Sequence, residues 1–73
     1  MKKKFYICGT RPVIREIHND YEEYFSFQWE TGQFKQDMQY MENIYFDSSG
    51  DVKEVSETEF NAYVEKLRKE KEL

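Results

Sequence analysis

The chain has 73 residues, of which 36% are charged and 18% are aromatic, and its formal net charge at pH 7 is −4. This length predicts one small domain over residues 1–73, because a domain needs on the order of 50 residues to enclose a core. The single cysteine, Cys8, excludes an internal disulfide. No apolar run reaches the roughly 18 residues of a membrane span, and no secretory signal is evident, so we expect a cytoplasmic protein without a membrane partner.

The first part of the chain predicts two strands. In residues 3–8, Phe5 and Ile7 alternate with polar or smaller side chains, which is typical of a half-buried strand. The stretch from Gly9 to Pro12 interrupts this strand, because proline fixes its own φ and restricts the residue before it. Residues 13–18 predict a second, less regular strand.

The next segment contains the clearest strand pattern in the chain. Asn19 and Asp20 supply turn residues, and alternation then continues through residues 23–30. Its apolar side chains are expected to point inward and its Tyr24 and Ser26 side chains outward. The inward set is Phe25, Phe27 and Trp29.

The segment after Gly32 fits two structures. Its larger side chains recur at a spacing that a helix could also use: Phe34, Met38, Met41 and Tyr45. A two-residue turn at Thr31 and Gly32 would instead pair Trp29 with Phe34 and Phe25 with Met38. This pairing favours a strand over residues 34–40, followed by a short strand over residues 44–46 and a turn over residues 47–51.

The C-terminal segment predicts one helix with a well-marked start. Ser56 is a favourable N-cap, and Glu59 three residues later completes a capping box. Val55 and Phe60 can pack across that start as a hydrophobic staple. A short strand over residues 52–55 leads into the helix, which should cover residues 57–70.

These elements predict an α+β fold, an antiparallel meander of four to five strands with one C-terminal helix packed on one face. The opposite face of the sheet is expected to be partly open to water. The predicted core consists of Phe5, Ile7, Ile17, Phe25, Phe27, Trp29, Phe34, Met38, Ile44, Phe46, Val55, Phe60, Val64 and Leu67.

The residues that could carry catalysis are few, so we expect no enzymatic activity, no catalytic residues and no cofactor. Cys8 is the only thiol and His18 the only histidine, and a structural role is the preferred interpretation of both. One imidazole near flexible carboxylates is a weak metal-binding pattern, and a solvated turn explains it better. We therefore predict no metal site among His18, Asp20, Glu22 and Glu23.

The distribution of charge carries more information than the net charge. Residues 1–15 contain five Lys or Arg and no acid, whereas residues 16–59 contain twelve acids and two lysines. An acidic middle part repels nucleic acid and attracts a cationic partner. The first hypothesis is a small non-catalytic binding protein that docks on a basic protein surface. Its narrower form is a nucleic-acid mimic that acts as an inhibitor, a kind of protein that phages and mobile elements encode. The predicted contact residues are Glu22, Glu23, Glu30, Asp37, Glu42, Asp47 and Asp51.

Two alternatives depend on the sheet face that the helix leaves open. Exposed Tyr6, Tyr24 and Tyr45 could stack on a single-stranded nucleic acid beside the cluster of lysines at residues 2–4, although the negative net charge argues against such a ligand. Homodimerisation through the same face is the other alternative, because it would enlarge a small core.

Overall fold

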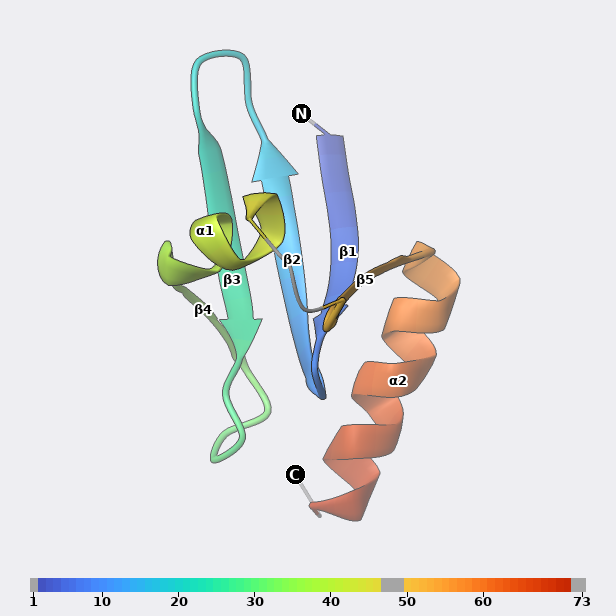
Figure 1. Cartoon of the computed structure of the whole chain (residues 1–73). Coiled ribbons are helices and arrows are strands. Elements are labelled where there is room, and N and C mark those ends of the chain that lie inside the picture. Colours follow the sequence, from blue (N-terminus) through green and yellow to red (C-terminus); the bar gives the residue numbers. More distant parts are fainter. Residues whose placement is uncertain (1, 47–49, 72–73) are drawn as a thin grey trace.

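The computed structural model describes residues 2–46 and 50–71 and has an α+β fold (Figure 1). Within these residues, five strands form one antiparallel sheet in the order β4-β3-β2-β1-β5, accompanied by two helices. The elements are β1 (Lys2–Cys8), β2 (Arg11–Ile17), β3 (Glu22–Phe27), β4 (Phe34–Gln36), α1 (Gln39–Tyr45), β5 (Val52–Val55) and α2 (Glu57–Glu70).

The first two hairpins are tight. Gly9 and Thr10 join β1 to β2, and Gly9 has a φ of 64°, a backbone conformation that glycine adopts without strain. Asn19 and Asp20 join β2 to β3, as expected, where the residues that flank them share a backbone hydrogen bond of 2.8 Å. Strand β2 starts earlier than predicted and includes Pro12 near its first residue. Pro12 lies opposite Ile7 of β1, and the pairing of β2 with β3 starts only at Val13, so the missing N–H of Pro12 breaks no bond to β3.

The pairing predicted for the third hairpin is wrong by two residues. Phe27, rather than Trp29, lies opposite Phe34 in the β3–β4 ladder, so the connecting loop is longer than the predicted two-residue turn. Gly32 has a φ of 72°, and its N–H donates to the carbonyl of Gln28 over 2.8 Å. A two-residue turn of the common hairpin type needs positive φ at both residues, which a β-branched residue such as Thr31 disfavours.

The strand predicted over residues 34–40 is correct for residues 34–36 only, and the strand predicted over residues 44–46 is wrong, because the second half of this segment is helical. β4 ends at Gln36, and α1 covers Gln39–Tyr45. Met38 and Phe46, both predicted to lie in the core, are exposed. The turn predicted over residues 47–51 falls partly on residues 47–49, which lie outside the described residues.

The C-terminal elements have the predicted bounds, and β5 forms one edge of the sheet. β5 pairs antiparallel with β1, so the chain passes from the β4 edge to the opposite edge after α1. α2 has the predicted bounds, and Ser56 Oγ accepts a hydrogen bond of 3.1 Å from the backbone N–H of Glu59. This capping bond satisfies one of the otherwise unpaired N–H groups in the first turn.

The two helices lie on opposite faces of the sheet, and each covers its own apolar cluster (Figure 1). The face expected to be open therefore carries a second cluster, because α1 covers part of it. The cluster under α2 contains Phe5, Phe27, Phe60, Val64 and Leu67 as buried members, all predicted core residues. The cluster on the α1 side contains Tyr6, Val13 and Tyr24 as buried members, with Tyr40 and Ile44 of α1 packed against it.

Candidate functional site

The three tyrosines of the predicted aromatic face lie close together but do not form an open platform. Tyr6 is 6% exposed and Tyr24 is 0% exposed, so the expectation that their rings face water is wrong. Only Tyr45, on α1, is exposed. A surface for stacking bases needs accessible rings, and the nucleic-acid hypothesis therefore loses two of the three rings on which it depended.

Arg15 of β2 connects these tyrosines to one another. Its guanidinium donates to Tyr6 Oη over 3.2 Å, to Tyr45 Oη over 2.6 Å and to the carboxylate of Glu22. The hydroxyls of Tyr24 and Tyr45 donate to Glu22 Oε2 over 3.0 Å and 2.7 Å. The network holds the end of α1 against the sheet, because Tyr45 belongs to the helix and the other four residues belong to strands.

The network changes the proton affinity of its members. The hydrogen bond from Arg15 and, to a smaller extent, the one from Tyr45 lower the pKa of Glu22 below its ordinary value. Burial, followed by the neighbouring carboxylate of Glu22, raises the pKa of the Tyr24 hydroxyl. Burial opposes the charge of Arg15, but the bonds to Glu22 and Tyr6 outweigh it and raise the pKa of the guanidinium. All three groups are therefore held in their ordinary charge states at neutral pH, which is the behaviour of a structural network.

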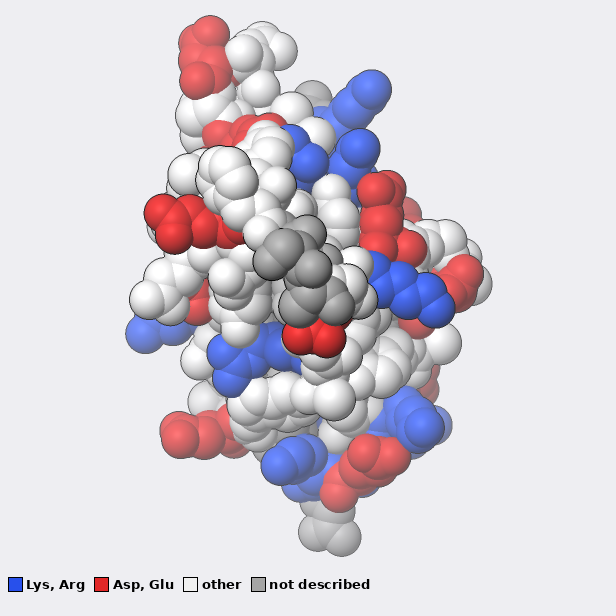
Figure 2. Space-filling view, viewed as in Figure 1, with Lys and Arg blue, Asp and Glu red and all other residues white. Residues whose placement is uncertain are grey.

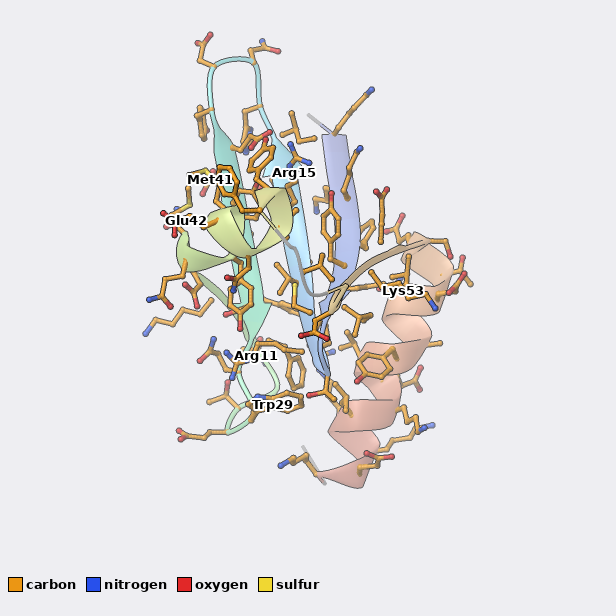
Figure 3. All side chains as sticks on the ribbon, in the orientation of Figure 1. Arg11, Arg15, Trp29, Met41, Glu42 and Lys53 are labelled. Atoms are coloured by element: carbon orange, nitrogen blue, oxygen red, sulfur yellow. The ribbon has the colours of Figure 1, made fainter. Side chains whose placement is uncertain are left out.

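The outer surface of α1 presents large apolar side chains to water. Met38 is 42% exposed, Met41 37%, Tyr45 52% and Phe46 79%, and no residue of the helix is buried. Figure 3 shows Met41 and Glu42 together on one side of α1, with Arg15 on its other side. Large apolar side chains that are exposed together on one short element are typical of a contact site for another macromolecule.

The chain segment that carries these side chains contains acidic but no basic residues. Residues 37–46 contain Asp37 and Glu42 and no Lys or Arg. Asp37 has a local role, because its Oδ1 accepts from the N–H of Gln39 over 3.2 Å and its Oδ2 accepts from the hydroxyl of Ser26 over 3.3 Å. Glu42 is exposed on the helix. The apolar side chains of α1 are thus accompanied by acids of their own segment.

The seven predicted contact acids do not form one continuous patch. Glu22 is engaged by Arg15 on the α1 face, whereas its neighbour Glu23 points to the opposite face of β3. Glu30 lies in the β3–β4 loop, and Asp51 lies directly before β5. Figure 2 shows acidic and basic side chains interspersed over the face that carries α1. Asp47, the remaining predicted contact residue, lies outside the described residues.

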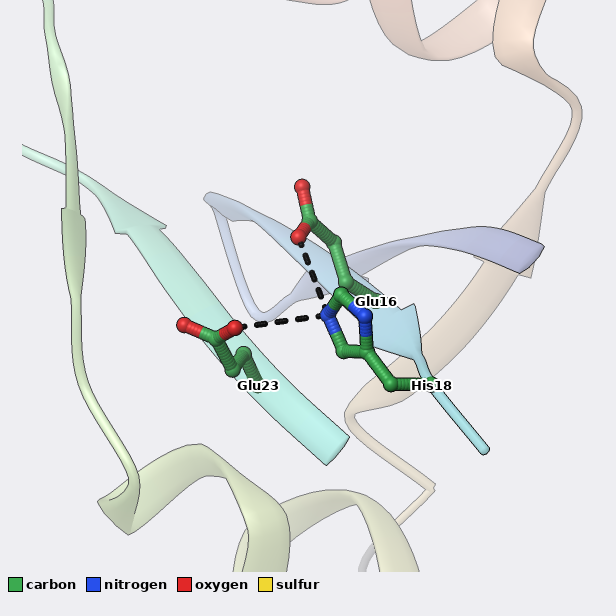
Figure 4. Close-up of side chains that lie close together, drawn as sticks. All are labelled: Glu16, His18 and Glu23. Atoms are coloured by element: carbon green, nitrogen blue, oxygen red, sulfur yellow. Dashed lines mark ion pairs between the residues drawn. The ribbon is translucent and has the colours of Figure 1, made fainter. Parts of the chain in front are cut away.

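A second cluster, which was not predicted as a group, lies on the face opposite α1. His18 Nε2 is 3.4 Å from Glu16 Oε1 and 3.3 Å from Glu23 Oε1 (Figure 4). Glu16 is absent from the predicted set, although a two-residue turn at Asn19-Asp20 already implies that Glu16 and Glu23 lie opposite each other. The register of that turn was the signal that could have identified the cluster.

The residues considered for catalysis are far from one another in the sheet. Cys8 ends β1 beside the Gly9-Thr10 turn, whereas His18 follows the last residue of β2 at the other end of the hairpin. Cys8 packs against the cluster on the α1 face, and the His18 side chain belongs to the opposite face. The structure therefore does not bring this thiol and this imidazole together.

Comparison with protein-family models, with curated proteins and with solved structures finds no match for this chain. Among the described residues, no helix has both the length and the apolar character needed to cross a membrane.

Proposed function

We propose that this chain is a non-catalytic binding protein that docks on a basic protein surface, with the outer face of α1 at the centre of the contact. The observation that carries the proposal is the exposure of Met38, Met41 and Phe46 around a short helix that has no buried residue of its own. Protein interfaces are enriched in Met and aromatic side chains, which fill pockets on the partner. These three side chains supply such anchors.

The proposed partner is basic because the segment that carries the anchors is acidic. Glu42 lies beside Met41 on α1, and the chain as a whole has a net charge of −4. Complementary charge raises the rate of encounter and selects among partners, and its effect falls as salt is added. Glu22 contributes indirectly, because it holds Tyr45 in place rather than facing a partner freely. Inhibition by mimicry of nucleic acid is the narrower form of this proposal, and it rests on the negative charge alone.

The test compares variants of α1 against a purified partner. Affinity capture from cells of the source organism, followed by mass spectrometry, names the partner, and isothermal titration then measures its affinity. We expect Met41→Ser with Phe46→Ser to weaken binding at least about tenfold, because fully burying each such side chain is worth about 1.5–3 kcal/mol. Glu42→Lys should weaken binding mainly at low salt.

The matched control is Glu65→Lys, which makes the same charge change on an exposed position of α2. It should leave the affinity close to that of the unchanged chain. Equal losses from the α1 variants and the α2 variant would contradict the proposed location. Sedimentation of the protein alone checks self-association, and a dimer that the Phe46 substitution dissociates would assign this face to a second copy instead of a basic partner.

A further inference from the structure

Two carboxylates face each other on the neighbouring strands β2 and β3, near the Asn19-Asp20 turn. Glu16 of β2 and Glu23 of β3 are Cα partners in the antiparallel ladder, so their side chains project from the same face. Like charges directly opposite each other destabilise a pair of strands. A cation bound between the two carboxylates would remove this repulsion.

The imidazole of His18 lies beside both carboxylates and aims one nitrogen at them (Figure 4). Its Nε2 is buried, and it has no hydrogen-bond partner among the described residues. It lies 3.4 Å from Glu16 Oε1 and 3.3 Å from Glu23 Oε1, and the three donor atoms all lie within 4.8 Å of one another. A tetrahedral zinc ion with bonds of about 2.0–2.1 Å separates its ligand atoms by about 3.3–3.4 Å. The two nitrogen–oxygen separations match two edges of that tetrahedron.

Each of the three side chains has a further contact with a neighbouring residue. Lys3 Nζ lies 3.8 Å from Glu16 Oε2, and Gln36 Nε2 donates to Glu23 Oε2 over 3.4 Å. The imidazole ring stacks on Tyr21, with ring centroids 4.3 Å apart. The outer oxygen of each carboxylate is thus engaged, while the inner oxygen faces His18. Contacts of this kind orient metal ligands and tune their affinity.

We propose that Glu16, His18 and Glu23 form a binding site for one divalent transition-metal ion, with Zn²⁺ as the expected ligand. The ligand atoms are Glu16 Oε1, His18 Nε2 and Glu23 Oε1, and water completes a fourth position. Imidazole and carboxylate oxygen together suit Zn²⁺, and three protein ligands with one open position are a common zinc arrangement. The ion would neutralise the opposed carboxylates and cross-link β2 to β3. Because the cluster lies on the face opposite α1, this site is independent of the proposed docking surface.

The test titrates Zn²⁺ into the metal-free chain near neutral pH by isothermal calorimetry and follows thermal unfolding with and without the ion. We expect one ion per chain, a higher unfolding temperature with zinc and reversal by EDTA. His18→Gln and Glu23→Gln should each lower the affinity by about tenfold or more, since even outer-shell changes typically cost about 10–100-fold. Circular dichroism in EDTA establishes that each variant is folded without metal.

The matched control is Asp20→Asn, which removes one negative charge from an exposed position of the same turn and should keep the affinity unchanged. A Cys8→Ser background removes the single thiol as a competing ligand. The ¹⁵N resonances of the imidazole identify the bound nitrogen, and we expect zinc to shift Nε2. The proposal would be overturned by an absence of saturable zinc binding, by a His18→Gln affinity equal to that of the unchanged chain, or by a zinc-induced shift of Nδ1 in place of Nε2.

Discussion

Replacing Arg15 by methionine removes the centre of the network that joins α1 to the sheet. Methionine keeps the apolar stem of the side chain but loses the hydrogen bonds to Tyr6, Glu22 and Tyr45. The carboxylate of Glu22 then keeps its bonds from Tyr24 and Tyr45. The substitution therefore tests whether this network stabilises the fold.

The burial of the ion pair sets the expected magnitude. The side chains of Arg15 and Glu22 are 13% and 23% exposed, so the pair is neither a surface pair nor a fully buried one. Surface pairs contribute about 0–1 kcal/mol, whereas removing one partner of a buried pair costs about 3–5 kcal/mol. We expect Arg15→Met to lower the free energy of unfolding by about 2 kcal/mol. That loss is large for a chain of this length, whose total stability should be roughly 4–11 kcal/mol.

The assay is urea unfolding followed by circular dichroism, with EDTA present. Lys69→Met is the matched control, because it breaks the Glu65–Lys69 pair, whose side chains are 69% and 77% exposed. This control should cost no more than about 0.5 kcal/mol. If Arg15→Met costs as little as Lys69→Met, the network is not a source of stability and the reasoning from burial is refuted. A double-mutant cycle with Glu22→Gln then isolates the coupling between Arg15 and Glu22.

Three further predictions concern stability and can be checked by the same urea titration. Ser56→Ala should lower the free energy of unfolding by about 1 kcal/mol, because it removes the cap on α2, whereas Ser56→Thr should retain most of it; equal losses would contradict the capping role. Phe60→Ala should cost about 3–5 kcal/mol because its ring is buried between the sheet and α2, while the exposed Phe46→Ala should change stability by no more than about 0.5 kcal/mol. The lowered pKa of Glu22 means that its contribution is present above the ordinary glutamate pKa of about 4.3 and is lost as the pH falls below it. Glu22→Gln should therefore flatten this part of the pH profile, and an unchanged acid dependence would refute the assignment.

The hairpins show where local patterns were sufficient. Asn19 and Asp20 were predicted as a turn, and the ladder on both sides of them follows from a two-residue connection. The two-residue turn predicted at Thr31 and Gly32 was wrong because, of these two residues, only Gly32 readily adopts a positive φ. The connecting loop is therefore longer and includes Trp29. Trp29 lies beside Arg11 and Lys71, 5.6 Å and 5.8 Å from its ring centre, and these cations come from the opposite ends of the chain. Contacts between such distant residues are not visible in a local pattern.

The strand prediction for the segment that forms α1 was wrong for a related reason. Its apolar spacing fitted a helix as well as a strand, and none of its helical residues is buried, so periodicity toward a core could not decide between them. The helix is attached through the partly buried side chains of Tyr40 and Ile44 and through polar contacts. Tyr40 accepts from Arg11, 29 residues away, and Tyr45 accepts from Arg15, 30 residues away. Met38 and Met41 stay exposed because Tyr40, Ile44 and the hydroxyl of Tyr45 contact the sheet instead.

The sequence by itself determined the fold class, the bounds of α2 and its cap, because these depend on side chains within a few residues of one another. Only the tertiary structure decided which acids remain on the surface and which are engaged. Glu22 meets Arg15, and Glu16 meets Glu23 around His18, through the register of neighbouring strands. Charge along the chain shows how many carboxylates there are, but their energies depend on distances across the sheet, which the register sets.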